Sequence, residues 1–239
     1  NHAMAVAHAG ATLGVPVTVC MPAHAVPRKI EATRALGADV VLVESDLVGT
    51  AYRLAAERGL TLLHPFDDPA VVAGHAGVGL ELVADLSDVD LVLVPVGGGG
   101  LISGVATAVK HLAPAARVVG VEPETSDVVS LSLAAGRPEV LAAPRSIADG
   151  LTAPITGEVP FRHIQSLVDE VVRVSDDAIL AALRTLVNEE RVEAEPAAAA
   201  GLAALESGMV RPPRGAKVVL VVSGGNVSPE LLAQVRASA

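Results

Sequence analysis

Short apolar runs with the length of a β-strand alternate along this chain with longer segments typical of helices. Runs such as "LVLVPV" and "VVLVV" are apolar at every position, so both faces of these strands are expected to be buried. Such strands, joined through helices, are typical of parallel sheets between helical layers, and we expect an α/β fold. The expected strands are residues 15–21, 40–44, 61–63, 91–96, 117–121, 170–174 and 218–222. The expected helices are residues 28–36, 50–58, 71–86, 101–112, 176–191 and 198–208, with one further helix at each end and a long Pro- and Gly-rich loop over residues 136–160.

The composition argues against several classes of function. A net charge of -10 and very few aromatic residues disfavour nucleic-acid binding, which needs a basic face and stacking rings. No apolar run approaches the roughly 20 residues that a membrane span requires. Cys20 is the only cysteine, which excludes a disulfide framework and a thiol metal cluster. Because no signal-peptide pattern is visible, we expect a cytoplasmic protein with neither a nucleic-acid nor a membrane partner.

Four consecutive glycines, Gly97–Gly100, stand between a strand-like run and a helix in "LVLVPVGGGGLISGVATAVKHL". Residues without a Cβ allow several backbone N–H groups to converge on one anion, and the start of the helix adds a favourable partial charge. The pattern therefore predicts a phosphate site built without a basic side chain. The structural alternative is a tight strand-to-helix turn in which glycine only permits close packing.

Two kinds of phosphate ligand can be compared with this loop. No Gly-Lys-Ser/Thr follows, which excludes a nucleotide P-loop. Gly98, Gly100 and Ser103 fit a relaxed dinucleotide fingerprint, and Glu122 ends the next strand, where a ribose-binding acid would stand. An NAD-dependent oxidoreductase therefore remains an alternative. A serine at the third position and the fourth consecutive glycine count against it.

A second junction of this kind occurs in "KVVLVVSGGNVSPELLAQV", where an apolar run ends in a small polar loop before a helix with Pro229 at its start. Ser223 is expected at the carboxyl end of the strand, where open α/β sheets bind ligands. A plain Ser-Gly-Gly turn is the alternative. Two such junctions in one sheet predict a shared ligand.

Eight segments in register carry a resemblance to a known family: "NHAMAVAHAGATLGVPVTVCMP", "KIEATRALGADVVLVE", "HPFDDPAVVAGHAGVGLEL", "VPVGGGGLISGVATAVK", "GVEPE", "SIADGLTAP", "VEAEPAAAAG" and "VLVVSGGNV". In these segments the chain resembles the fold-type II pyridoxal-phosphate enzymes, specifically threonine/serine dehydratases (threonine ammonia-lyases) and serine racemases. The resemblance implies two parallel-sheet α/β domains of the tryptophan synthase β type. Residues 1–63 would form an incomplete small domain and residues 64–239 the large coenzyme-binding domain.

The resemblance also assigns site residues. The glycine loop and the Leu101 amide would hold the phosphate of pyridoxal 5'-phosphate, Ser223 would bond the pyridine nitrogen, and Asn1 would contact the 3'-oxygen. Glu195 would lie near the ring, and Gly150 would line the site. The implied coenzyme-binding residues are Asn1, Gly97, Gly98, Gly99, Gly100, Leu101, Gly150, Glu195 and Ser223, and the implied substrate-binding residues are Asn1 and His2.

The implied reaction is that of a lyase of amino-acid metabolism: dehydration and deamination of L-threonine or L-serine to a 2-oxo acid and ammonia by a homo-oligomer, a dimer or tetramer. The family's Schiff-base lysine lies in a stretch like S-F-K-x-R-G that has no match here. Lys29, Lys110 and Lys217 have the contexts of ordinary surface lysines. We therefore expect this lysine upstream of Asn1, no catalytic residue within the chain, and no activity of the chain alone. A serine or threonine racemase and a non-catalytic coenzyme-binding remnant remain alternatives.

Two further patterns carry weaker expectations. "GVEPETSDVVS" partly matches a divalent-cation site of the racemases, but Val128 stands where an acid is expected, and the sequence assigns no metal to Glu122. "HPFDDP", with Phe66 instead of a polar residue, favours the dehydratases. His2, His64 and His75 are acid–base candidates for which packing or a surface position is the simpler role.

Overall fold

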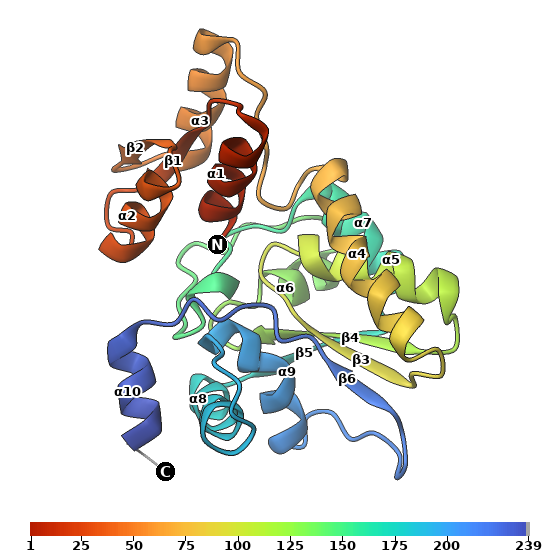
Figure 1. The fold of residues 1–239 in the computed structure, drawn as a ribbon. Helices are drawn as coiled ribbons and strands as arrows, with labels where there is room; N and C mark the ends of the chain where they lie inside the picture. Colours follow the sequence, from red (N-terminus) through yellow and green to blue (C-terminus); the bar gives the residue numbers. More distant parts are fainter. Residues whose placement is uncertain (238–239) are drawn as a thin grey trace. The chain divides into compact units, whose positions relative to one another are not determined.

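The structure, a computed structural model, describes residues 1–237 (Figure 1). The chain divides into two compact units, Asn1–Leu63 and a second unit that begins at His64. Each unit has its own parallel sheet. None of the described helices combines the length and apolar character needed to cross a bilayer.

The first unit pairs β1 (Thr18–Pro22) with β2 (Asp39–Val43) in a parallel register from Thr18↔Asp39 to Pro22↔Val43. Its helices are α1 (His2–Leu13), α2 (Pro27–Ala35) and α3 (Leu47–Arg58). Gly14 ends α1 in the left-handed conformation, which glycine adopts without strain.

Two strand expectations in this unit need correction. The strand expected over residues 15–21 begins only at Thr18, because the Val15 N–H bonds to Gly10 O at the end of α1 and Pro16 has no N–H to donate. Residues 61–63 form no strand. They pair with neither β1 nor β2, and a parallel strand needs such a neighbour for its backbone hydrogen bonds.

The second unit is built on a four-stranded parallel sheet in the order β5-β4-β3-β6. These strands are β3 (Leu91–Pro95), β4 (Arg117–Pro123), β5 (Glu170–Val174) and β6 (Val218–Leu220). The helical elements around them are α4 (Pro69–Asp85), α5 (Gly100–Leu112), α6 (Val128–Ala135), the 3₁₀ turn η1 (Asp149–Leu151), α7 (Glu158–Leu167), α8 (Asp176–Arg184), the π turn η2 (Thr185–Glu189), α9 (Pro196–Glu206) and α10 (Pro229–Ala237).

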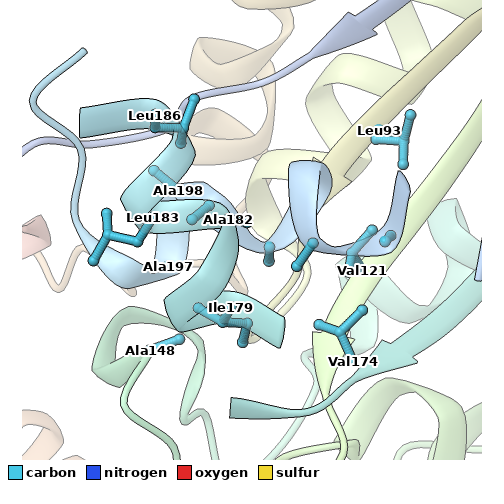
Figure 2. Close-up of a cluster of buried hydrophobic side chains, with 14 of the residues drawn as sticks. Leu93, Val121, Ala148, Val174, Ile179, Ala182, Leu183, Leu186, Ala197 and Ala198 are labelled. Carbon is cyan, nitrogen blue, oxygen red and sulfur yellow. The ribbon is translucent and has the colours of Figure 1, made fainter. Parts of the chain in front are cut away.

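Alternate residues of β3 enter two different cores. Leu91 and Leu93 join the cluster formed with α8 and α9, whereas Val92 and Val94 join the cluster that contains the apolar face of α5. Figure 2 shows the first cluster, in which Ala197 and Ala198 of α9 lie among larger side chains of α8. The expectation of an α/β fold with parallel strands buried on both faces is confirmed.

Helix boundaries differ from expectation in the second unit. The helix expected over residues 176–191 ends at Arg184 and continues as a π turn, in which the Glu190 N–H reaches Thr185 O five residues back. Helices α6 and α7 were not expected. The loop expected over residues 136–160 is present up to residue 157, where α7 follows; within it a bridge joins Val140 to Ile155 and η1 buries Leu151.

Candidate functional site

The glycine loop Gly97–Gly100 leaves the carboxyl end of β3 and starts α5. Gly98, Gly99 and Gly100 are buried. Gly99, the N-cap of α5, has a φ of 93°, a conformation that side-chain-bearing residues rarely adopt. The chain therefore enters the helix through a turn that requires glycine at this position.

The amide groups of this loop are donors without acceptors. Among the described residues 1–237, the N–H groups of Gly97, Gly98, Gly99, Gly100 and Leu101 donate to no acceptor. Buried N–H groups are rarely left unpaired in folded proteins. Together with the positive end of the helix dipole, these donors form an anion site that needs no basic side chain.

Close packing supports the loop from behind. A Cβ on Gly98 would lie 2.5 Å from the ring atoms Cε1 and Cγ of Phe66, and one on Gly100 would lie 2.9 Å from Phe66 Cβ. A Cβ on Gly99 would meet Ile164 Cδ1 at 2.8 Å and Pro160 Cβ at 2.9 Å. The packing alternative considered for the glycines is thus also realised: the backbone is held against Phe66 and α7, and its amides still lack acceptors.

Three further predicted site residues lie close to this loop. A Cβ on Gly97 would lie 3.2 Å from Gly150 O, and one on Gly150 would lie 3.9 Å from Glu195 Oε1. The Glu195 N–H donates to Gly224 O at 3.0 Å, next to Ser223. The structure therefore brings Gly97, Gly150, Glu195 and the Ser-Gly-Gly loop together at the carboxyl end of the sheet. Glu195 is buried and Ser223 is exposed.

Asn1 and His2 belong to the first unit. Asn1 is the N-cap of α1. His2 Nε2 donates to Leu63 O at 3.2 Å, which ties the start of α1 to the end of the unit. Both residues are therefore described here by their contacts inside the first unit.

Glu122 lies at the carboxyl end of β4 with no exposed surface. Its Oε1 accepts from Val129 N at 3.1 Å, and its Oε2 accepts from Ser130 N at 2.8 Å and Ser130 Oγ at 2.7 Å. Burial raises the pKa of Glu122 to about 7, and these hydrogen bonds oppose that rise. Both oxygens are engaged by the first turn of α6, so this carboxylate anchors a helix and does not fit the ribose-binding role. Among residues 1–237, no three His, Cys, Asp or Glu side chains are grouped to hold a metal ion.

The lysines of the second unit lie away from the glycine loop. Lys110 is near the carboxyl end of α5 and Lys217 directly precedes β6, so both belong to the amino-terminal edge of the sheet. Lys110 Nζ lies 2.7 Å from Asp169 Oδ2 and donates to Ala116 O at 2.8 Å. The expectation of an ordinary surface lysine is wrong for Lys110, because its side chain is only 20% exposed. Lys217 is half exposed and pairs with Asp88.

The turn that carries Phe66 has an acceptor at its base. His64 Nδ1 accepts from Asp67 N at 2.9 Å and from Phe66 N at 3.4 Å, and the two rings meet edge to face with centroids 4.6 Å apart. Burial lowers the pKa of His64, although Asp67 and Asp68 act in the opposite direction. Asp67 Oδ1 accepts from Val159 N, which joins this turn to α7. His75, the third histidine candidate, packs against α5 with its Nδ1 buried and without a hydrogen-bond partner among the described residues.

Sequence reasoning missed the residues that support the glycine loop. Phe66 was noted only as a feature that favours dehydratases over racemases, and Thr156 was not noted at all. The HPF stretch could have indicated a rigid turn, but its contact with Gly98 joins residues far apart in the chain. Thr156 lies in a Pro- and Gly-rich segment with no periodic signal.

Comparison with protein families gives one match that covers most of the chain. The family model described as pyridoxal-phosphate dependent enzyme matches residues 1–224. This range includes every predicted site residue, from Asn1 to Ser223.

Named relatives agree with this match. The chain is 40% identical to an L-threonine ammonia-lyase of Thermotoga maritima over 236 residues, 97% of the chain and 58% of that enzyme. It is 39% identical to a phenylserine dehydratase of Ralstonia pickettii over 236 residues, 98% of the chain and 72% of the relative. The structure of maize serine racemase superposes with a TM-score of 0.91 at 34% identity, covering 99% of this chain and 74% of that one. The chain thus spans 58% of the length of the Thermotoga enzyme.

Proposed function

The chain belongs to the family of pyridoxal-phosphate dependent enzymes, and we propose that the protein containing it dehydrates and deaminates L-threonine or L-serine to a 2-oxo acid and ammonia. The relatives from Thermotoga and Ralstonia are by name an L-threonine ammonia-lyase and a phenylserine dehydratase. Their names and their identity to nearly the whole chain support this reaction class.

The single observation that carries the proposal is the set of unpaired amides at Gly97–Leu101. A phosphate group fits them because it brings charged acceptors to donors that have none in the fold. When bound, pyridoxal phosphate supplies an electron sink that stabilises negative charge at the substrate Cα. The residues present therefore fit the cofactor of the family.

The other predicted site residues have separate roles in the proposal. The Ser223 hydroxyl would bond the ring nitrogen; unlike a carboxylate, a hydroxyl leaves that nitrogen largely unprotonated. Gly150 and Glu195 would line the site beside the loop. Asn1 would contact the 3'-oxygen, and Asn1 and His2 would receive the substrate carboxylate.

We propose that the lysine that anchors the cofactor and takes the Cα proton is none of Lys29, Lys110 and Lys217. The positions of Lys110 and Lys217 at the opposite edge of the sheet support this for two of them. Lys29 lies in the first turn of α2, in a sequence context unlike that of the family's lysine. Residues 1–239 would then be inactive by themselves.

Three broader proposals accompany this assignment. The second unit would be the coenzyme-binding domain, and the first unit part of the small domain. The protein would act in the cytoplasm as a homo-dimer or homo-tetramer. The separate parallel sheets of the two units support the division into domains.

A racemase acting on serine or threonine is the second candidate. The close superposition on maize serine racemase favours it, since such an enzyme would use the same site residues. Phe66 in place of a polar residue supports the dehydratase, through the resemblance of "HPFDDP" to that group.

One assay separates these candidates. The full-length protein is incubated with pyridoxal phosphate and either L-threonine or L-serine, and both 2-oxo acid and substrate chirality are followed. We expect 2-oxo acid from at least one substrate. D-amino acid without 2-oxo acid would replace the proposal by the racemase. Borohydride reduction followed by peptide mass spectrometry identifies the anchoring lysine, and a label on Lys29, Lys110 or Lys217 would contradict the assignment above.

A further inference from the structure

Two buried hydroxyls hold the carbonyl groups of the glycine loop. Thr156 Oγ1 donates to Gly98 O at 3.2 Å. Ser103 Oγ donates to Gly99 O at 2.7 Å, and the Ser103 N–H donates to the same oxygen at 3.1 Å. Ser103 is fully buried and Thr156 is 2% exposed. These bonds are not needed to explain the anion site itself, which consists of amides.

Because of the geometry of the peptide bond, a hydroxyl that holds a carbonyl group also sets the direction of the N–H group on the opposite side of the peptide. In a planar trans peptide the C=O and the following N–H point in opposite directions. A hydroxyl that holds Gly98 O therefore directs the Gly99 N–H away from Thr156. Ser103, by holding Gly99 O, directs the Gly100 N–H in the same manner. Glycine peptide planes rotate more freely than others, so this orientation requires a restraint.

We propose that Ser103 and Thr156 are positioning residues of the anion site, whose hydroxyls orient the Gly98–Gly99 and Gly99–Gly100 peptides so that their N–H groups face the phosphate. The nature of that anion, the phosphate of pyridoxal phosphate, rests on the proposed function. Restraining the loop before binding removes an ordering cost that the ligand would otherwise bear.

The two hydroxyls come from different parts of the unit. Ser103 is in the first turn of α5, and Thr156 precedes α7. The Ser103 hydroxyl also lies 3.4 Å from Pro160 O, and Pro160 packs against Gly99. The loop is thus held between its own helix and the start of α7, and the sequence alone indicated neither residue as a support of the loop.

Thr107 provides a control on the same helix. Its hydroxyl donates to Ser103 O at 2.7 Å, which is the same bond to the carbonyl four residues back that Ser103 makes to Gly99. Thr107 is exposed and does not contact the glycine loop through this bond. Removing its hydroxyl tests whether the loss of any such bond in α5 affects ligand binding.

The test compares dissociation constants for pyridoxal phosphate and for pyridoxal, which lacks the phosphate. Purified wild-type protein is compared with Thr156→Val, Ser103→Ala, Thr156→Ser and Thr107→Ala. We expect Thr156→Val and Ser103→Ala each to weaken pyridoxal phosphate about tenfold, on the scale of one hydrogen bond, and pyridoxal less than about twofold. Thr156→Ser restores the hydroxyl and should bind like wild type, and Thr107→Ala should change neither constant.

Some outcomes of this test would overturn the inference, and another separates it from the proposed function. Equal weakening of both ligands by Thr156→Val and Ser103→Ala, or no weakening, would show that the hydroxyls do not act through the phosphate. If wild type binds neither ligand, the proposed function fails, and crystal structures of the ligand-free proteins decide the positioning role. In those structures, unchanged peptide planes in Thr156→Val and Ser103→Ala would overturn the positioning role. Rotated or heterogeneous planes at Gly98–Gly100 would support it.

Discussion

The Phe66 ring lies directly against the backbone of Gly98, so that even a Cβ at this glycine would come 2.5 Å from ring atoms Cε1 and Cγ. This contact joins the start of the second unit to the loop that follows β3. Glycine is therefore required at position 98 for its small size. The loop packs against an aromatic ring on one side and presents its amides on the other.

The contact predicts a non-additive pair of substitutions. Gly98→Ala should lower the free energy of unfolding by about 1–3 kcal/mol, because the new methyl group overpacks the ring. In Phe66→Ala the ring is absent, so adding Gly98→Ala should have a much smaller effect. Urea denaturation of the four proteins measures the coupling. Simple additivity would mean that the ring and the glycine do not interact as described.

From the hydrogen bonds of His64 we expect the free energy of unfolding to fall in mild acid. Its Nδ1 accepts two backbone N–H groups, and its pKa lies below the ordinary 6.5 because of burial. Protonation is therefore easier in the unfolded chain, so this contribution to stability is present above pH 6.5 and is lost as pH falls through the lower folded pKa. His64→Asn keeps an acceptor without titrating. Between pH 7 and pH 5, wild type should lose more stability than His64→Asn in urea denaturation, and parallel losses would argue against the role of Nδ1.

Glu122 predicts the opposite dependence on pH. Its folded pKa of about 7 lies above the usual 4.5, so its contribution is fully present below pH 4.5 and is lost as pH rises through 7. The Ser130 hydroxyl stabilises the charged carboxylate. Ser130→Ala should therefore lower the free energy of unfolding by about 2 kcal/mol at pH 8 and by less at pH 5. An equal loss at both values would show that Glu122 does not titrate in this range.

Lys110 and Lys217 should behave differently on substitution. Lys110→Met removes the bonds to Asp169 and Ala116 O from a largely buried site, and a loss of about 1–2 kcal/mol is expected. Lys217→Met removes an exposed pair with Asp88, and its urea midpoint should match that of wild type. Neither variant should change the affinity for pyridoxal phosphate. Loss of cofactor binding in Lys110→Met at unchanged stability would contradict the structural role.

The sequence predicted correctly the elements whose own residues show a clear pattern of buried apolar side chains. Strands β3 and β4 are apolar along most of their length, and the alternating core contacts of Leu93 and Val94 follow from their period. The nearness of Gly97, Gly150 and Glu195 was expected only through the resemblance, since the contacts join residues far apart in the chain.

The failures have a common physical origin. Residues 61–63 are apolar enough for a strand, but a strand exists only where a neighbour supplies hydrogen bonds. Glu122 stands where a ribose-binding acid would, but α6 folds onto it and takes both oxygens. The π turn after Arg184 keeps an apolar pattern that does not distinguish it from an α-helix. In each case a tertiary or backbone contact determined the structure or role that the residues adopt.

The most direct test of the account is a ¹H–¹⁵N NMR titration of the protein with pyridoxal phosphate, followed at the assigned amides of Gly97–Leu101. Because these N–H groups have no acceptor within the described fold, we expect them to move downfield as they bond to the phosphate, while the amide of Lys110 stays in place. Binding that leaves the Gly97–Leu101 amides unshifted would contradict the assignment of this loop as the phosphate site.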